Sequence, residues 1–595
     1  MLPSIARQVA VSGWNPMMGR DILAEPVTAA ADDGAGTPVV ATRSAGSALG
    51  TGGALLPLLA LAACGDGGGG STASASGSTS ATPAAATTPV VVVNAAPTPT
   101  EASRFLAQAT MGATRSTIDA VVSRGYDGWL TDQMALPRAT SHYDWLVAGG
   151  FTAATYKFKT DGLDPSIWRQ MIVEPDQLRQ RIGMALLDIF VVAIEGVTHS
   201  WRSFSMAAYV DILLDNAFGN YRTLMGAVTT SFAMSSYLTY YQNRKANPTT
   251  GTQPDENYAR ELMQLFTIGL YQLNMDGSLK MNGGQPIETY SQADVSGLAR
   301  IFTGLTLNGT EDLPPLYRQP LVMNAGLNET GASSFLGTTV TGGGMAAINS
   351  ALDTIFAHPN MPPFVARQLI QRLVTSNPSA AYITRVASTF ADNGQGVRGD
   401  MKAVIRAILL DSEARTLPTS GAVGKLREPV LRFTGWARAF GATSPSNAWA
   451  IGDTNAVTRL SQTKGHSPSV FNFYRPGYTP AGTSLASSGL VAPEFQITNE
   501  QTVIGFVNFM YGVIANGIGD VKADYTAILT LAADSKALVD EINLVLAAGQ
   551  LSSATQTAIR TAVDSVSATA TNGPINRVGI AILLTMASPD YLNQR

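Results

Sequence analysis

Residues 254–305 read PDENYARELMQLFTIGLYQLNMDGSLKMNGGQPIETYSQADVSGLARIFTGL. On a helical wheel of about 100° per residue, 256–270 divides into an apolar arc and a polar arc. The polar arc holds Glu256, Asn257, Arg260, Glu261 and Gln264. The pair Asp276-Gly277 predicts a hairpin turn, and Ser291 predicts the N-cap of a second helix that carries Asp294. This stretch therefore predicts a helix, a hairpin and a second helix.

The polar arc has two interpretations, and the sequence leaves both open. In the first it is a solvated face, on which Glu256 and Arg260 form an i,i+4 ion pair that contributes roughly 0.3–0.5 kcal/mol. In the second, Asn257, Arg260 and Glu261 point into a cleft. A carboxylate beside a guanidinium can be held ionised there for acid–base work or polar ligand binding.

The chain on either side of this stretch is mostly helical in pattern. Helices are expected within 103–136, 176–193, 204–216, 221–241, 345–358, 363–376, 379–392, 400–412 and 425–440, and over most of the last hundred residues. The region 308–344 is rich in glycine and poorly patterned, which predicts loops with short strands. The expected fold class is mainly α, a multi-helix globular domain with a small β-hairpin and long irregular loops.

The first hundred residues have a different character. The run ALLPLLALAA at 54–63 has the length of a signal-peptide core and is too short to span a bilayer. It ends in Leu-Ala-Ala-Cys, which resembles a bacterial lipobox with Cys64 as the acylated residue. We therefore expect residues 1–63 to be a signal peptide with an N-terminal extension. Residues 64–100 would be a disordered Gly, Ser, Thr and Pro tether with an end-to-end distance on the order of 30 Å.

This N-terminus predicts where the protein resides. Gly65 follows the cysteine where an aspartate would favour inner-membrane retention, so we expect a lipoprotein of the cell envelope, anchored in the outer membrane and either periplasmic or surface-exposed. Only the lipid anchor would contact the membrane. The folded domain is expected to occupy residues 101–595.

Composition excludes several classes of function. The chain has 595 residues, 45% of them hydrophobic and 14% charged, and a net charge of -4. Such a balance provides no basic surface for nucleic acid. One cysteine and four scattered histidines make a zinc site improbable, and we expect no metal and no cofactor.

Three weaker sequence motifs lack the neighbouring residues or elements that their functions require. The segment GQGVRG at 394–399 matches the dinucleotide-binding pattern, but a helical pattern precedes it where that motif needs a strand. The loop around Asp276 lacks the first aspartate and last glutamate of a calcium loop. Ser469 lacks the second glycine of a nucleophile elbow. His466, nearby, could act as a base or as a packing residue.

Several segments together resemble one family. They include LRQRIGMALLDIFVV at 178–192, YQNRKANPTTGTQPDENYARELMQLFTIGLYQLNMDGS at 241–278, KLREPVLRF at 425–433 and SPSVFNFYRPGY at 467–478. They are similar to the domain of unknown function 1800 family of exported bacterial proteins, and the resemblance spans 101–595. It implies no assigned chemistry. It does imply a possible partner, an exported protein of the domain of unknown function 1501 family. Many members have histidine where this chain has Phe266, so a mechanism that needs that histidine is in doubt.

Candidate site residues follow from these patterns. The candidates for catalysis are Glu261, Glu256, Arg260, Asn257 and His358. The candidates for binding are Asn243, Lys245, Asp294, Arg367, Arg427, Glu428, Asn472 and Arg475.

Two functions remain open at this point. The favoured one is a non-catalytic lipoprotein that binds or scaffolds another exported protein. The alternative is a hydrolase or other enzyme acting on an extracytoplasmic polysaccharide through the Glu, Arg and Asn cluster. Because two carboxylates on one helix cannot flank one bond, this alternative needs a third, such as Asp294 or Glu428, at roughly 5–9.5 Å.

Overall fold

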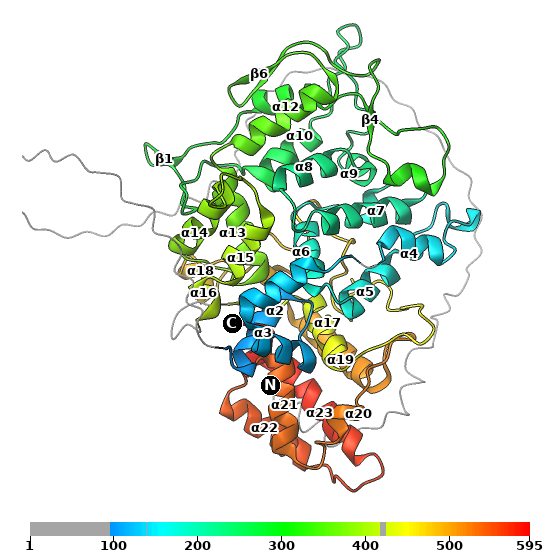
Figure 1. Cartoon of the computed structure of the whole chain (residues 1–595), viewed down its shortest axis with the longest axis vertical. Helices are drawn as coiled ribbons and strands as arrows, with labels where there is room; N and C mark the ends of the chain where they lie inside the picture. Colours follow the sequence, from blue (N-terminus) through cyan, green and yellow to red (C-terminus); the bar gives the residue numbers. More distant parts are fainter. Residues whose placement is uncertain (1–95, 139, 417–423) are drawn as a thin grey trace, which may run out of the picture. The chain divides into compact units, whose positions relative to one another are not determined.

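The chain folds as a mainly α protein, as the sequence predicts (Figure 1). The computed structural model describes residues 96–138, 140–416 and 424–595. The predicted signal peptide, Cys64 and nearly all of the predicted tether lie outside the described residues. Within the described ranges, no helix has both the length and the apolar character needed to cross a bilayer.

The helices have the following bounds. They are α2 (Pro99–Ala109), α3 (Arg115–Ala135), α4 (His142–Ala148), η2 (Ala154–Tyr156), α5 (Leu163–Val173), α6 (Gln177–Leu187), η3 (Ile194–Gly196), α7 (Arg202–Asp215), α8 (Tyr221–Thr229), α9 (Phe232–Tyr237), α10 (Asn257–Glu261), η4 (Leu262–Thr267), α11 (Gln292–Ile301), η5 (Pro314–Arg318), α12 (Gly344–Ala357), α13 (Met361–Leu373), α14 (Ala380–Ala391), α15 (Met401–Leu409), α16 (Ser412–Arg415), α17 (Pro429–Ala439), α18 (Ser484–Ser487), η6 (Pro493–Ile497), α19 (Glu500–Asn516), α20 (Thr526–Leu529), α21 (Ser535–Ala547), α22 (Ser553–Asp564), α23 (Gly573–Ala587) and α24 (Pro589–Leu592).

Strands are short and pair two by two in antiparallel sheets throughout the described chain. The pairs are β1 (Met281–Asn282) with β2 (Gln285–Pro286), β3 (Leu305–Thr306) with β4 (Val322–Met323), β5 (Ser333–Phe335) with β6 (Thr338–Val340), and β7 (Lys425–Leu426) with β8 (Asn593–Gln594). The last pair matters most for the site, because Lys425 pairs with Gln594. The helix expected over 425–440 therefore begins only at Pro429, because Lys425 and Leu426 are held in this strand pair.

Capping side chains set the helix starts where the sequence places them. Thr114 and Ser291 each form a capping box at the start of α3 and α11, and Asp400 accepts hydrogen bonds from the first backbone amides of α15. Such caps satisfy amides that lack an intrahelical partner. The glycine-rich segment 394–399 is a loop between α14 and α15, as its context predicts. The predicted turn also forms, since the Asn274 amide donates to the Ser278 carbonyl at 2.8 Å.

One expected helix is shorter than the sequence indicates. The pattern over 176–193 predicts a continuous helix, but α6 ends at Leu187. Asp188 leaves the helix because its carboxylate is bonded to Lys464 and Asn472, which come from a distant part of the chain. The apolar residues that follow continue as buried irregular chain. A tertiary ion pair therefore overrides the helical pattern here.

Two other expected helices are divided. The pattern over 221–241 is α8 followed by α9, because the Ser231 hydroxyl accepts from the Met234 amide and starts a new helix. The pattern over 256–270 is a short α10 that continues as the π-helix η4. Inserting a π-turn rotates the residues after Glu261 relative to an ideal α-helix. The single polar arc expected from the wheel is therefore broken.

Helix α13 is the element around which the site is built. It packs against α14, η4 and α6, and its apolar side belongs to a hydrophobic core that extends through the described chain. All described residues belong to one compact unit. Figure 1 shows α13, α14 and α15 as neighbours, with α8, α10 and α12 above them in the view.

Candidate ligand-binding pocket

A pocket of about 340 Å³ lies where α13 meets η4. Its volume is at the small end of the range of about 300–1,000 Å³ that is common for small-molecule sites. We call it the α13 pocket. It is lined by Asp188, Ile189, Gln264, Leu265, Gly269, Leu270, Tyr271, Leu273, Leu279, Phe364, Arg367, Gln368, Gln371, Arg372, Val470, Phe471, Pro476 and Gly477.

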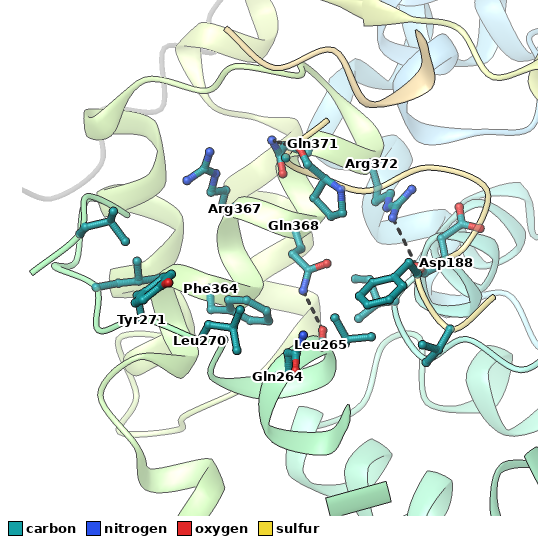
Figure 2. A pocket seen from close by; sticks show the side chains of 18 residues that line it. Asp188, Gln264, Leu265, Leu270, Tyr271, Phe364, Arg367, Gln368, Gln371 and Arg372 are labelled. Atoms are coloured by element: carbon teal, nitrogen blue, oxygen red, sulfur yellow. Dashed lines mark hydrogen bonds between the residues drawn. The ribbon is translucent and has the colours of Figure 1, made fainter. Parts of the chain in front are cut away.

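Helix α13 supplies most of the polar lining. Its contributing residues are Phe364, Arg367, Gln368, Gln371 and Arg372, which are spaced i, i+3, i+4, i+7 and i+8 and so share one helix face. Figure 2 shows these side chains around the pocket, with Gln368 extending toward Leu265 of η4. Sequence analysis identified only Arg367 among them. The i, i+3, i+4, i+7 spacing is a signal in the sequence that places these residues on one helix face, but it does not show that the face lines a pocket.

The π-helix η4 forms the opposite wall. Because π-turns leave carbonyls out of the usual helical pattern, two of them are free to accept from other elements. The Gln368 amide donates to the Leu265 carbonyl at 3.1 Å, and the Tyr221 hydroxyl donates to the Phe266 carbonyl at 2.8 Å. The Phe266 side chain itself is fully buried against Phe190, with ring centroids 5.2 Å apart. Position 266 therefore faces the core.

The chain after η4 turns back along the pocket. Gly269 allows this turn, since its φ of 72° is in the left-handed region and an added Cβ would lie 2.7 Å from the Phe364 ring. Asn360 then holds the segment, because its amide nitrogen donates to the Ile268 and Tyr271 carbonyls at 3.0 and 2.7 Å. Its Oδ1 accepts from the Leu273 amide at 2.8 Å. Asn360 was missed from the sequence.

Arg367 is the one lining cation without a bonded partner. Its guanidinium forms no hydrogen bond and no ion pair with any residue in the part of the chain that the structure describes. Burial lowers the pKa of Arg367, and no nearby carboxylate opposes that effect. Arg367 and Asp188 lie on opposite sides of the pocket in Figure 2. The side chain is a half-buried positive charge directed at space that a ligand could fill.

Behind the pocket lies a network that we call the buried ionic cluster. It consists of Arg181, Asp188, Arg372, Lys425, Glu428, Lys464 and Glu494, all of them buried. Lys464 Nζ lies 2.8 Å from Asp188 Oδ2 and 3.0 Å from Glu428 Oε2. Lys425 Nζ lies 2.9 Å from Glu494 Oε1. Burial raises the pKa of Glu428, but Lys464 and the other cations outweigh that effect and hold the pKa well below its usual range.

Arg372 and Asp188 join this cluster to the pocket, because both also line it. The Arg372 guanidinium donates to the Asp188 carbonyl at 3.3 Å and lies over the Tyr474 ring, 4.8 Å from its centroid. The Asp188 carboxylate also accepts from Asn472 at 3.0 Å. The cluster holds four cations and three carboxylates, so the pocket is backed by a small excess of positive charge.

None of the residues predicted for catalysis lines the α13 pocket. Glu256 accepts from Arg260 at 3.0 Å, from Gln292 at 2.7 Å and from Ser296 at 2.5 Å, in a partly exposed network. Asn257 contacts Thr239 at 3.4 Å on the surface. Glu256 and Arg260 form the i,i+4 ion pair that the first interpretation, a solvated face, predicts. Neither side chain reaches the α13 pocket.

Glu261 is in a different environment. It is 7% exposed, and its Oε2 has no hydrogen-bond partner in the described chain. Burial raises its pKa, while Arg260 partly opposes the shift. The Tyr290 hydroxyl is also buried without a hydrogen-bond partner, and its pKa is raised to about 12 by burial and by Glu261. Glu261 does not line the α13 pocket.

The other predicted residues divide into structural and site positions. His358 accepts from the Asn360 amide at 3.2 Å, and Asn243 bonds Asp255 in both directions at 3.0 and 2.9 Å. Asp294 accepts from Ser291 and Leu336 amides at 2.7 Å each. The Lys245 amide donates to the Leu327 carbonyl at 2.7 Å. The bonds of Asn243, Asp294 and Lys245 hold the backbone around α10 and α11, whereas that of His358 lies between α12 and α13.

The predicted arginines do not gather in one place. Arg427 is buried with its Nε donating to the Tyr591 carbonyl at 3.3 Å, and it lines a separate, smaller cavity. Arg475 lies 4.7 Å over the ring of Phe471, a pocket residue, but is itself exposed. Of the predicted binding residues, Arg367 lines the α13 pocket, and Glu428 and Asn472 lie in or against the buried ionic cluster.

His466 belongs to a third group of charges. Its Nε2 lies 2.7 Å from Asp164 and its Nδ1 lies 2.6 Å from Glu195. Burial alone would lower the pKa of His466, but the hydrogen bonds to these two carboxylates raise it to about 10. Since the ring is bonded on both nitrogens, it joins α5 and η3 to the loop that carries Lys464.

The chain was compared with known proteins at three levels. The model of a family described as Protein of unknown function (DUF1800) matches residues 104–593. Neither the curated proteins nor the solved structures yielded a match. The matched range contains every residue of the α13 pocket and of the buried ionic cluster.

Proposed function

This chain belongs to the DUF1800 family, and from that premise we propose that it is an exported, lipid-tethered binding protein whose ligand site is the α13 pocket. One observation carries the proposal. The pocket combines a largely apolar lining with Arg367, a cation that has no bonded partner among the described residues. Apolar concavity with a few convergent polar groups is typical of ligand sites.

The polar lining favours binding over hydrolysis. A glycosidase needs two carboxyl groups on either side of the scissile bond. Asp188 is the one carboxylate in the lining of the α13 pocket, and Lys464 and Asn472 already bond it. Glutamine amides, guanidinium groups and the Tyr271 hydroxyl supply the rest of the polar lining. Such groups orient a ligand but do not shuttle protons near neutral pH.

The experiment blocks the pocket by substitution. Gly477 lines the pocket, an added Cβ there would meet nothing within 4 Å, and its φ is outside the left-handed region, so Gly477→Trp adds an indole at the pocket lining without straining the backbone. Gly512 in α19 has the same open surroundings far from the pocket lining, which makes Gly512→Trp the matched control. The probe is N-phenyl-1-naphthylamine, an uncharged fluorescent amine. We expect wild type and Gly512→Trp to bind it and Gly477→Trp to lose binding. Equal binding by all three would overturn the proposal.

The predicted N-terminus supports the envelope location. The sequence Leu-Ala-Ala-Cys at 61–64 resembles a lipobox, and a Gly, Ser and Thr tract follows it. Cys64→Ser should move the protein from the membrane fraction to the soluble envelope fraction. A variant that stays in the membrane fraction would contradict the tether. The family resemblance further suggests an exported protein of the domain of unknown function 1501 family as partner, which co-purification with the tethered protein would test.

A second candidate function rests on Glu261 alone. A buried carboxyl group with a raised pKa and a free oxygen is a possible general acid. Under this alternative the protein would act on an extracytoplasmic polysaccharide. A polysaccharide hydrolysis screen of wild type against Glu261→Gln tests it, because the substitution keeps the shape and removes the acid. Turnover that disappears in Glu261→Gln, with folding intact, would favour the enzyme over the binding protein.

A further inference from the structure

The ligand of the α13 pocket can be specified further, and this step rests on the proposed function. We propose that the pocket takes an amphiphilic oxyanion, in which one carboxylate or sulfo group is attached to an apolar body of about the size of two fused rings. Arg367 would bind the anionic group. The apolar side chains at the pocket mouth would cover the body.

The first support is the state of Arg367. Guanidinium groups are strongly suited to oxyanions, because their planar fork can donate two parallel hydrogen bonds. In folded proteins a partly buried guanidinium usually has a carboxylate or carbonyl partner. Arg367 has none among the residues that the structure describes, although Gln368 and Arg372 on the same helix face are both bonded. Its donors are therefore available to a ligand.

The second support is Arg372, which is independent of the first. It is 4% exposed and lines the pocket, and its Nη1 has no hydrogen-bond partner in the described chain. Its Nη2 donates to the Asp188 carbonyl, and its guanidinium lies over the Tyr474 ring. A buried guanidinium nitrogen without an acceptor is costly. An anion in the pocket would place negative charge close to it.

The third support is the charge behind the pocket. Asp188 is the only carboxylate in the pocket lining. Both of its carboxylate oxygens accept from Lys464, and one of them also accepts from Asn472. Its charge is thus balanced within the buried ionic cluster, where cations outnumber carboxylates. A ligand anion would meet little repulsion from it. A cationic ligand would meet Arg367 with nothing to offset it.

The remaining lining determines the body of the ligand. Leu270, Tyr271 and Leu279 line the pocket and are 47%, 42% and 43% exposed, and Phe471 is 37% exposed. Large apolar side chains that are exposed together at a pocket mouth are typical of ligand or partner sites. Because the pocket volume is about 340 Å³, a compact apolar group fits and a long polymer does not.

Two fluorescent probes with the same ring system separate charge from shape. Anilinonaphthalene sulfonate carries one sulfonate on the frame of N-phenyl-1-naphthylamine. Wild type should bind the sulfonate at least about tenfold more tightly than the uncharged amine. Arg367→Gln should remove that preference and keep the amine affinity, while Arg367→Lys should retain part of it. Equal affinity of wild type for the two probes would overturn the inference.

The control and the outcomes keep the two proposals apart. Arg244 is an exposed arginine with no ion pair to the described residues, so Arg244→Gln removes the same charge away from the pocket. It should leave both affinities unchanged, and a loss equal to that of Arg367→Gln would overturn the inference as a mere net-charge effect. Amine binding that Gly477→Trp abolishes would support the proposed function even if the sulfonate preference is absent. Failure of both probes to bind would overturn both proposals.

The Arg367→Gln variant is expected to fold like wild type. Since Arg367 forms no ion pair with the described residues, its replacement by glutamine strands no carboxylate. The thermal unfolding midpoint of Arg367→Gln should be equal to that of wild type or higher. A variant that unfolds at a much lower temperature would mean that Arg367 has a structural partner, which would also overturn the inference.

Discussion

Glu256 has an arginine four positions further along the chain and Glu428 directly follows Arg427, yet the two glutamates are in opposite environments. Glu256 shares its oxygens with Arg260, four residues away, and with two α11 side chains, and the Arg260 and Glu256 side chains are 39% and 30% exposed. Glu428 is fully buried and is bonded to Lys464. The first network is local and solvated, whereas the second exists only because the chain folds.

The difference shows that charge density in a sequence does not locate a site. The stretch around Glu256 is richer in charge, but its charges are satisfied at the surface. The buried ionic cluster includes Asp188, Glu428 and Lys464. Its members come from distant parts of the chain, since the bond between Lys464 and Asp188 spans 276 positions. Its members adjoin the α13 pocket. Four experiments test how far this contrast holds.

The largest effect is expected from Lys464→Met. The substitution leaves Asp188 and Glu428 buried without their shared cation. Breaking a buried pair by removing one partner typically lowers the free energy of unfolding by about 3–5 kcal/mol. Urea denaturation at pH 7 measures it. Lys536→Met is the matched control, because Lys536 pairs with Asp540 on the surface and should contribute at most about 0.5 kcal/mol.

A second substitution sharpens this result. Adding Glu428→Gln to Lys464→Met removes one of the stranded charges, so the double variant should be more stable than Lys464→Met alone. Residues in one network are expected to show such non-additivity. If the two substitutions are simply additive, the cluster is not a coupled network and the contrast with Glu256 weakens.

The next effect concerns His466, which lies between the two extremes because Asp164 is partly buried and Glu195 is 61% exposed. The pKa of His466 is raised to about 10, above the value of about 6.5 for an unfolded histidine. Its contribution is therefore fully present below about pH 6.5 and is lost as pH rises through about 10. A hydrogen bond to a charged group contributes about 1.5–3 kcal/mol.

The measurement compares wild type with His466→Gln from pH 6 to pH 10. The difference in free energy of unfolding should be largest at pH 6 and should shrink toward pH 10, while lysine and tyrosine titrations cancel between the two proteins. His199→Gln is the control. The pKa of His199 is lowered by burial, below the value of about 6.5 for an unfolded histidine, so the ring is neutral in both states at high pH and its difference should stay constant from about pH 8 to pH 10, where that of His466 shrinks. A constant difference for His466→Gln would show that the ring is not held protonated.

Features that depend on local contacts could be predicted from the sequence, and features that depend on distant contacts could not. Capping residues such as Ser291 and the helical periodicity of α13 are local, so fold class and most helices could be predicted. The end of α6 could not, because it depends on Asp188 meeting Lys464. The π-turn in η4 was also missed, since nothing in the apolar pattern distinguishes it from an α-helix. Arg367 was identified as a candidate, but its lack of a partner is a property of the fold.

The smallest effect is expected from Glu256→Gln, and it tests the contrast from the other side. The Glu256 and Arg260 side chains are 30% and 39% exposed, so their ion pair is screened by solvent. A glutamine can still accept from Ser296, whose hydroxyl now bonds Oε1. The free energy of unfolding should therefore fall by at most about 0.5 kcal/mol, measured by urea denaturation with and without added salt. A loss comparable to that of Lys464→Met would mean that the α10 surface is energetically equivalent to the buried ionic cluster. In that case the polar arc, not the α13 pocket, would be the first place to look for a site.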